Sequence, residues 1–435
     1  MALNPEWLPM RWPGSWAEPA MLDLLKDTPF DCLVASARPV VDRARKAGLA
    51  VVRIGERAAG GGEAGPVIPV APRSSVAHAP SSPIVAFTEN VWPSIKLSAK
   101  EDRDVADTGP TGMPWVESNG WFVRMARALA PGRTIWIVAD PPEEKSLRRA
   151  EFYALAVSDA AAYGGRWVVS LDNELAAGVA SGNREALAAW KKISAAAAFH
   201  KRQAAWADFR PFGVLGVLSD FAGDNEFTAT EAVNLINRRN LGFHILNRTR
   251  GAELSLEGLK AVLYLDRQAP EGALRGKLLA FVRGGGLVVG APSCMTLTEG
   301  AKPSDQTHVR FRLWTLGSGR IAIAKEEFAD PYVLASDTHV LLSRRHDLLR
   351  VWNGSPAITY YAGSPDGRRA VVHILNYSAQ PVEFMSVRVM QPYRSARLWT
   401  AGGEPPAPLK VIPADGEAEF HLPPVGPYAA IELEA

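Results

Sequence analysis

The stretch from Asp107 to Asp140, DTGPTGMPWVESNGWFVRMARALAPGRTIWIVAD, predicts the fold of the chain around it. A loop rich in glycine and proline leads into a short apolar segment that ends at Glu117. An amphipathic helical pattern follows, and after a break at residues 130–132 a β-rich run ends at Asp140. This order of strand, loop, helix and strand is typical of parallel sheets. Catalytic groups collect at the carboxyl ends of the strands in a parallel barrel, and both predicted strands end in a carboxylate.

Short β-rich runs recur on both sides of this unit and predict an eight-stranded barrel. Helical patterns with apolar residues at i, i+3 and i+4 separate several of them, so residues 1–210 are expected to form a (β/α)8 (TIM) barrel. Residues 58–82 are rich in Gly, Pro and Ser and too short for full helices, which predicts an open or degenerate barrel there. The eight runs are Leu8–Trp12, Asp31–Ser36, Ala50–Gly55, Gly65–Ala71, Pro83–Thr88, Gly112–Glu117, Thr134–Ala139 and Arg166–Leu171.

Composition excludes several classes of protein. The chain has 435 residues, 47% of them hydrophobic, which is enough for the cores of two to four domains. Its net charge of +2 comes from 48 basic and 46 acidic residues without long blocks of one sign, so neither nucleic acid nor a membrane surface is an expected partner. Two cysteines and eight scattered histidines predict no disulfide framework and no metal site.

The N-terminus, MALNPEWLPMRW, has neither a charged segment nor an apolar core of the signal-peptide type. No run approaches the eighteen or so apolar residues of a membrane span. The sequence as it stands therefore predicts a cytoplasmic protein, or a periplasmic or secreted one if a signal peptide has been removed.

Carboxylates at the predicted strand ends point to glycoside hydrolysis. That reaction needs one carboxylic acid to protonate the leaving oxygen and a second carboxylate to attack the anomeric carbon or to activate water. Glu89 is the first candidate, because in IVAFTENVWP it ends an apolar strand. Glu117 in PWVESNGW is the second and Asp172 in VVSLDNE is the third.

Polar and aromatic residues beside these carboxylates are the candidates for binding sugar, because pyranose faces pack on aromatic rings as other apolar surfaces do. The candidate substrate-binding residues are Asn90, Trp92, Trp115, Asn119, Trp121, Asp140 and Arg53.

Each candidate also has a structural interpretation. Asp140 precedes two prolines, which favours a turn cap. Ser118 or Asn119 is suited to cap the following helix, with Glu117 as a solvated neighbour, and Asp172 is suited to cap a helix that starts near residue 174. The tryptophans are also suited to a hydrophobic core.

The rest of the chain predicts two further folding units. Residues 211–300 alternate strands and helices and predict a flavodoxin-like α/β domain. Its first loop after a strand lacks G-x-G-x-x-G, so no dinucleotide and no other cofactor is expected. Cys294 lies outside any strand-turn-helix signature and is expected to be a buried thiol. Residues 301–355 are expected to form strands and a helix that link this domain to the next. Residues 356–435 are expected to form an antiparallel β-sandwich.

The order of these units resembles that of bacterial beta-galactosidases. The run LLAFVRGGGLVVGAP (278–292) is similar to their glutamine-amidotransferase-like trimerisation domain, and VVHILNYS (371–378) with LPPVGPYAAIELE (422–434) resembles their C-terminal sandwich. The resemblance implies a carbohydrate substrate and self-association into a homo-oligomer. That family has an Asn-Glu acid/base after strand four and a Glu nucleophile after strand seven. Here Asn90 follows Glu89, and strand seven ends in Asp140.

Two functional hypotheses follow from the sequence. In the first, the protein is a glycoside hydrolase that uses Glu89 with Glu117 or Asp172. In the second, it is a non-catalytic carbohydrate-binding or scaffold protein that has lost the acid pair.

Overall fold

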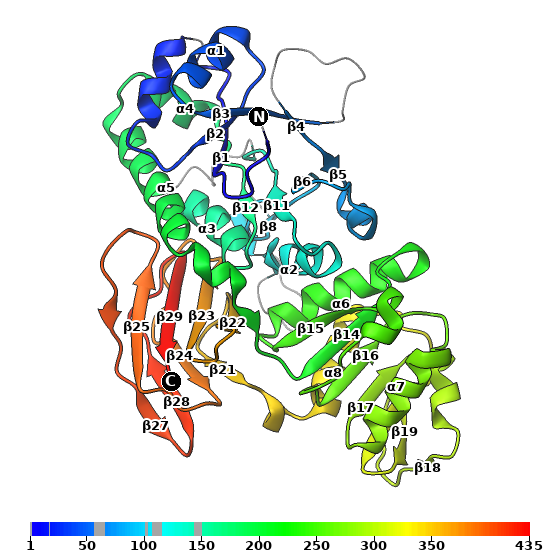
Figure 1. Cartoon of the computed structure of the whole chain (residues 1–435). Coiled ribbons are helices and arrows are strands. Elements are labelled where there is room, and N and C mark those ends of the chain that lie inside the picture. Colours follow the sequence, from blue (N-terminus) through cyan, green and yellow to red (C-terminus); the bar gives the residue numbers. More distant parts are fainter. Residues whose placement is uncertain (1, 17, 56–65, 101–102, 107–114, 143–149) are drawn as a thin grey trace.

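The computed structural model describes residues 2–16, 18–55, 66–100, 103–106, 115–142 and 150–435. The chain forms three lobes (Figure 1). We call them the parallel-sheet lobe (residues 2–208), the α/β lobe (212–342) and the antiparallel lobe (210–211 with 349–435). The first residue of the run expected at 65–71 and residues 112–114 of the run expected at 112–117 lie outside the described residues.

The parallel-sheet lobe contains two four-stranded parallel sheets. Their orders are β1-β2-β3-β4 and β12-β11-β6-β5, and a parallel bridge between Met10 and Val169 connects β1 to the chain that follows β12. Strand β6 is buried at every residue, which is typical of parallel sheets covered on both faces. The strands are β1 Pro9–Arg11, β2 Cys32–Val34, β3 Ala50–Ile54, β4 Val67–Ile68, β5 Val70–Ala71, β6 Ile84–Phe87, β11 Thr134–Ile137 and β12 Arg166–Trp167.

The described residues differ from the expected eight-stranded barrel in two places. The run expected at 112–117 supplies only β10 (Val116–Glu117), which pairs antiparallel with β7 (Ser94–Ile95) outside the parallel sheets. The run expected at 65–71 is divided at Pro69 into β4 and β5, which pair with β3 and β6 respectively. Proline has no N–H for a ladder hydrogen bond, which accounts for the interruption. A second small antiparallel pair joins β8 (Leu97–Lys100) to β9 (Arg103–Ala106).

Helices cover the parallel sheets where the apolar periodicity predicted them. In α2 the residues Trp121, Phe122, Met125 and Ala126 are buried, and the helix stops before Gly132, whose φ is 78°. The helical segments of this lobe are η1 Pro19–Leu25, α1 Arg38–Lys46, η2 Arg73–His78, α2 Gly120–Leu129, α3 Ala150–Ala161, α4 Asn173–Ala180, α5 Arg184–Arg202 and η4 Ala204–Asp208.

The α/β lobe is built on one seven-stranded sheet. Its order is β15-β14-β16-β17-β20-β19-β18, and the first five strands are parallel. Numbered along the chain, those five strands have the order 2-1-3-4-5, which is the flavodoxin-like topology. The strands are β14 Leu215–Ser219, β15 Phe243–Asn247, β16 Ala261–Tyr264, β17 Leu287–Gly290, β18 Lys302–Pro303, β19 Phe311–Leu316 and β20 Gly319–Ala324.

The segment expected to link domains at residues 301–355 contributes to two lobes. Strands β18, β19 and β20 belong to the α/β sheet, and α8 packs against α6. Strand β21 belongs to the antiparallel lobe. The helical segments of the α/β lobe and of the turn after it are η5 Gly223–Asn225, α6 Glu226–Arg238, η6 Arg248–Glu253, α7 Gly272–Arg283, η7 Pro292–Thr298, α8 Pro331–Leu342 and η8 Arg344–His346.

The antiparallel lobe consists of two sheets that enclose a hydrophobic core. The sheets have the orders β13-β22-β23-β29-β25-β26 and β21-β24-β28-β27. Val372, Ile374 and Phe420 are among the fully buried members of this core. The strands are β13 Arg210–Pro211, β21 Leu349–Trp352, β22 Ala357–Gly363, β23 Arg369–Asn376, β24 Ser386–Val389, β25 Ser395–Thr400, β26 Ala407–Pro408, β27 Ile412–Ala414, β28 Glu417–His421 and β29 Tyr428–Glu434.

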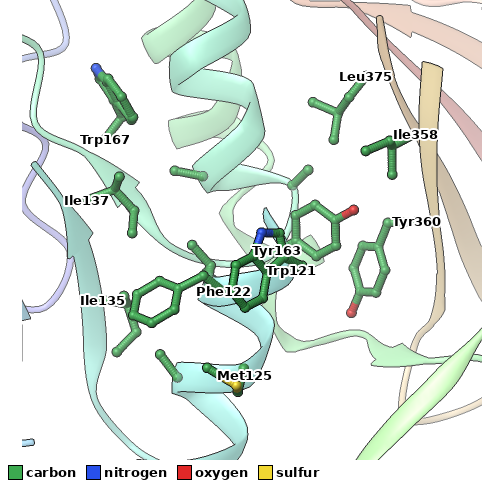
Figure 2. Packing of buried hydrophobic residues seen from close by; sticks show 14 of the residues in the cluster. Trp121, Phe122, Met125, Ile135, Ile137, Tyr163, Trp167, Ile358, Tyr360 and Leu375 are labelled. Carbon is green, nitrogen blue, oxygen red and sulfur yellow. The ribbon is translucent and has the colours of Figure 1, made fainter. Parts of the chain in front are cut away.

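One hydrophobic cluster extends through all three lobes. Figure 2 shows Tyr163 between the α2 side chains of Trp121 and Phe122 and the ring of Tyr360 on β22. The rings of Tyr163 and Tyr360 are stacked, with centroids 4.5 Å apart. The α/β lobe joins the same cluster through residues such as Leu215 on β14. The shared core holds the lobes in fixed positions, so a site at their boundary has a defined geometry.

Candidate functional site

Glu89 lies just past the carboxyl end of β6, with its side chain exposed. Its φ is 62°, in the left-handed region that costs a residue with a Cβ about 1–2 kcal/mol. Strained backbone of this kind is tolerated where surrounding structure fixes it, and it clusters at functional sites. The backbone at Glu89 is therefore strained, at the point where β6 has just ended.

The residues after Glu89 fix that backbone. Asn90 donates from Nδ2 to the carbonyl oxygens of Phe87 (2.6 Å) and Val138 (3.2 Å), which ties the loop to two neighbouring strands. Trp92 is buried, and its ring contacts the rings of Tyr153 and Trp167 edge to face. Asn90 and Trp92 therefore fix the loop that follows Glu89. The ring of Trp92 is part of the hydrophobic core.

Asn119 anchors the same loop from the other side. It is fully buried, accepts a hydrogen bond from the backbone N–H of Val91 at 3.1 Å and donates to the Val91 carbonyl at 2.8 Å. Its Oδ1 also accepts from Nη2 of Arg73 at 3.1 Å. Asn119 precedes the first residue of α2, and its side chain caps none of that helix's N–H groups.

A buried carboxylate that the sequence analysis missed lies beneath this loop. Asp159 on α3 accepts from the backbone N–H groups of Asn119 (2.7 Å) and Gly120 (3.3 Å), from Nδ2 of Asn119 (3.2 Å) and from the hydroxyl of Tyr377 (2.6 Å). Burial raises the pKa of Asp159, and these hydrogen bonds oppose the rise. Asp159 stands at the N-terminus of α2, where the helix dipole favours a negative charge. A charged residue within an otherwise apolar helical pattern is the signal that could have revealed it.

Arg73, at the start of η2, connects this network to Glu89. Its guanidinium lies 5.1 Å from the ring centroid of Trp121 and 4.8 Å from that of Phe122. Burial lowers the pKa of Arg73 to about 10, and the negative charges of Asp159, Glu231 and Glu89 oppose that shift. Arg73 lies in a segment rich in Pro and Ser, and no sequence pattern marks it as part of a site.

Glu117 approaches the same region from β10. It pairs with Ser94 of β7 and is half-buried. Its negative charge, like that of Glu231, acts on Arg238, whose pKa burial lowers to about 10. The guanidinium of Arg238 lies 3.8 Å from the ring centroid of Trp115. Glu89 and Glu117 thus act on two arginines, Arg73 and Arg238, that both also interact with Glu231.

The two aspartates make structural contacts. Asp140, exposed after β11, forms an ion pair with Arg11 and accepts from Ser170 at 3.3 Å. Asp172 caps α4 by accepting from the N–H of Leu175 at 2.8 Å, and its second oxygen accepts from the Tyr153 hydroxyl at 2.8 Å.

The two remaining predicted residues are Trp121 and Arg53. Trp121 is buried in the shared core and donates from Nε1 to the carbonyl of Ser118. Arg53, on β3, is half-buried, and its Nε has no hydrogen-bond partner among the described residues.

Within the described ranges, no group of three or more His, Cys, Asp or Glu residues is arranged to hold a metal ion. None of the described helices is long and apolar enough to cross a membrane. Cys294 is buried in η7, where burial raises the pKa of its thiol to about 12.

No known protein family and no curated protein sequence matches the chain. Solved structures do match its fold. An alpha-L-fucosidase isoenzyme from Paenibacillus thiaminolyticus has a TM-score of 0.51 at 13% identity, covering 72% of this chain and 62% of its own. A beta-galactosidase from Bacillus circulans has a TM-score of 0.51 at 10% identity, covering 91% and 65%. A GH42 beta-galactosidase from G. stearothermophilus has a TM-score of 0.50 at 10% identity, covering 92% and 66%.

These matches show that the chain has a glycoside-hydrolase-like fold of mixed α/β class. The aligned part is less than two thirds of the length of each of these three structures. At this level of identity the comparison shows the fold, and the activity has to be argued from the residues.

Proposed function

We propose that the protein is a glycoside hydrolase acting on an O-glycosyl bond, with Glu89 as the acid/base and Glu117 as its partner. The observation that carries the proposal is the exposed carboxylate of Glu89, held at the carboxyl end of a buried parallel strand with a φ of 62°. Asn90 and Asn119 anchor its loop with four side-chain hydrogen bonds to backbone groups. A scaffold this well fixed fits a group that must meet a substrate in one orientation.

The chemistry assigned to the pair follows from the demands of glycoside cleavage. Glu89 would donate its proton to the leaving oxygen, while Glu117 would attack the anomeric carbon or activate water. A sugar ring bound over Glu89 would exclude water from it, and desolvation favours the protonated carboxyl that a general acid needs. Arg238 would stabilise the ionised Glu117 before proton transfer, and Arg73 would stabilise the Glu89 carboxylate that the transfer leaves behind.

The parallel strands support the same proposal. We infer that the two parallel sheets are a degenerate form of the (β/α)8 barrel, since their strands follow in chain order and the bridge between Met10 and Val169 joins them at one end. At the other end only Pro69 separates β4 from β5. The carboxyl ends of the strands then share one edge, where Glu89 and Asp140 both lie.

We also propose that the α/β lobe is an amidotransferase-like module, similar to the trimerisation domain of bacterial beta-galactosidases, and that it takes part in self-association. Its strand order of 2-1-3-4-5 supports the assignment of fold. Sedimentation of the purified chain tests the association. A mass that stays monomeric at high concentration would contradict it.

Two substitutions test the catalytic assignment. Glu89→Gln and Glu117→Gln keep the shape of each side chain and remove its proton chemistry, so each should reduce hydrolysis of an aryl glycoside by about two orders of magnitude or more. Glu185→Gln is the matched control, because Glu185 is an exposed residue in the first turn of α5 in the same lobe. Full activity of both test variants would remove the assignment.

The second candidate is a carbohydrate-binding protein without catalysis. The observation that favours it is the structural use of the other two strand-end carboxylates, Asp140 by Arg11 and Asp172 by α4 and Tyr153. Binding on a glycan array together with no release of reducing sugar would support this function. Release of reducing sugar that Glu89→Gln abolishes would exclude it.

A further inference from the structure

A cavity of ≈ 930 Å³ lies where the α/β lobe and the antiparallel lobe meet, next to the β10 segment. Residues from α6, α8, η8, β21 and the start of β22 form its wall. Figure 1 shows the yellow segment that leads from α8 to β21 between the two lobes. The volume of the cavity is within the range of pockets that bind small ligands, about 300–1,000 Å³.

The wall of this cavity carries a strong excess of positive charge. Among the described residues that line it, Asp347 is the one carboxylate, and its Oδ1 lies 2.7 Å from Nε2 of His339. The net charge of the whole chain is only +2, so the excess is local. The arginines in the wall are Arg238, Arg239, Arg344, Arg345 and Arg350.

Most of these arginines lack an acidic partner. In the part of the chain that the structure describes, no carboxylate lies within ion-pair distance of Arg239, Arg344, Arg345 or Arg350. Arg239 donates from Nη2 to the Ser336 hydroxyl at 3.2 Å, and its Nε is buried without a partner. Arg350 donates to the carbonyl of Arg344 at 3.1 Å. Like charges held together and a buried unpaired donor both cost free energy, and a bound anion would remove both costs.

A second cavity, of ≈ 700 Å³, is also lined by arginines, but its wall contains more acidic residues. Glu6 and Asp208 contribute carboxylates to its wall. Arg127 donates to two backbone carbonyls, and Arg133 donates to a third. Arg166 lies 3.6 Å from the carboxylate of Glu6. Nη2 of Arg124 and Nε of Arg166 are also buried without a hydrogen-bond partner among the described residues. The two carboxylates nevertheless offset part of the positive charge of this wall, so the argument for an anion is made for the first cavity.

Aromatic side chains accompany the arginines in the first cavity. Trp352 is 42% exposed, and Trp115 and Tyr332 also line the wall. The combination provides an apolar surface on which a pyranose ring can pack, beside donors that match the geometry of a carboxylate or a sulfate.

We propose that this cavity binds an acidic saccharide, whose carboxylate or sulfate group is held by Arg239 and Arg350 and whose ring packs on Trp352. The anionic part of the proposal rests on the unpaired arginines alone, and the saccharide part rests on the proposed function. Arg238 lies between this cavity and Glu117, so the cavity adjoins the candidate catalytic pair.

The test is a calorimetric titration of the purified chain, residues 1–435, with four probes. They are trigalacturonate, its methyl ester, a sulfated galactose disaccharide and inorganic sulfate. One or both acidic saccharides should bind at least about tenfold more tightly than the neutral ester, because each charge-assisted hydrogen bond contributes about that factor. Raising the salt concentration should weaken the binding, since Arg344 and Arg345 in the wall are exposed.

Variants locate the binding. Arg239→Gln and Arg350→Gln should each weaken it about tenfold, and Arg345→Glu, a charge reversal at an exposed residue that does not threaten folding, should weaken it as well. Arg43→Gln, the same loss of charge on the exposed face of α1, is the matched control and should bind as the wild type does.

Each outcome decides between the alternatives. Equal binding of the methyl ester, or unchanged binding in Arg345→Glu, would overturn the anion site. Inorganic sulfate that binds as tightly as the saccharides would overturn the saccharide assignment. Saturable binding by a protein that hydrolyses no glycoside would contradict the proposed function and support this inference. Hydrolysis of neutral aryl glycosides without binding of the acidic saccharides would support the proposed function and contradict this inference.

Discussion

The hydroxyl of Tyr377 donates a hydrogen bond of 2.6 Å to Oδ1 of Asp159, across the boundary between the antiparallel lobe and the parallel-sheet lobe. Both residues are buried, and the same carboxylate receives the backbone N–H groups at the start of α2. The position of the loop that carries Glu89 depends on Asn119, so this contact couples the third lobe to the candidate site.

Removing the Tyr377 hydroxyl should destabilise the protein. In Tyr377→Phe the carboxylate of Asp159 loses one charge-assisted hydrogen bond, which contributes about 1.5–3 kcal/mol. Urea denaturation followed by tryptophan fluorescence measures the change in the free energy of unfolding. Tyr264→Phe is the control, because that buried hydroxyl donates to a neutral carbonyl, that of Gln268, at 2.7 Å. It should cost only about 1 kcal/mol. Equal losses in the two variants would show that Asp159 carries no charge.

Two buried histidines should make the protein sensitive to acid. Burial lowers the pKa of His200 and of His373 to about 3, against an ordinary value of 6.5. Their contribution to stability is fully present above pH 6.5 and is lost as the pH falls toward about 3, because in that window the unfolded chain binds protons that the native state does not. Each histidine should lower the free energy of unfolding by about 1.4 kcal/mol per pH unit in that window.

Substitutions separate this effect from other titrations. Asp159 acts in the opposite direction, because its raised pKa makes the folded state lose stability as the pH rises. The comparison is therefore between the wild type and His373→Gln, whose stability should fall less steeply below pH 6.5. His78→Gln, at an exposed position, should follow the wild type. A wild-type slope in His373→Gln would contradict the prediction.

The sequence predicted strands well where burial alone decides them. Ile84–Phe87 and Thr134–Ile137 are short apolar runs between turn signals, and both form parallel strands. The run that ends at Glu117 has the same local pattern but pairs with Ser94–Ile95, because strand pairing depends on partners distant in the chain. The exclusion of that strand from the parallel sheets could not be read from its own residues.

The candidate site shows the same limit. The sequence predicts Glu89 at a strand end because its apolar run ends there, and the residues that follow Asp172 indicate the alternative of a helix cap. The network of Asp159, Asn119 and Tyr377 joins residues as far as 218 positions apart, and no local spacing encodes it. Arg73 and Arg238 were missed because a lone arginine next to an aromatic residue has no sequence signature.

The left-handed backbone of Glu89 predicts a conflict between stability and activity. Glu89→Gly removes the steric cost of a Cβ at a φ of 62° and should raise the free energy of unfolding by about 1 kcal/mol, while hydrolysis is lost with the carboxylate. Asp415→Gly is the matched control, because Asp415 has a φ of 45° in the turn between β27 and β28. It should gain similar stability and keep full activity. A Glu89→Gly variant that is less stable than the wild type would show that the Glu89 side chain serves the fold.

The thiols should be inert while the protein is folded. Cys32 and Cys294 have no exposed surface, and burial raises the pKa of both thiols, that of Cys294 to about 12. The reactive species is the thiolate, so a disulfide reagent such as DTNB should label neither cysteine in the native state and both after unfolding in guanidinium. Iodoacetamide should for the same reason leave any hydrolytic activity unchanged. Rapid native labelling of Cys294 would place an accessible, activated thiol in the α/β lobe. It would then favour acyl chemistry there, as in amidotransferases, over the carboxylate chemistry proposed for Glu89.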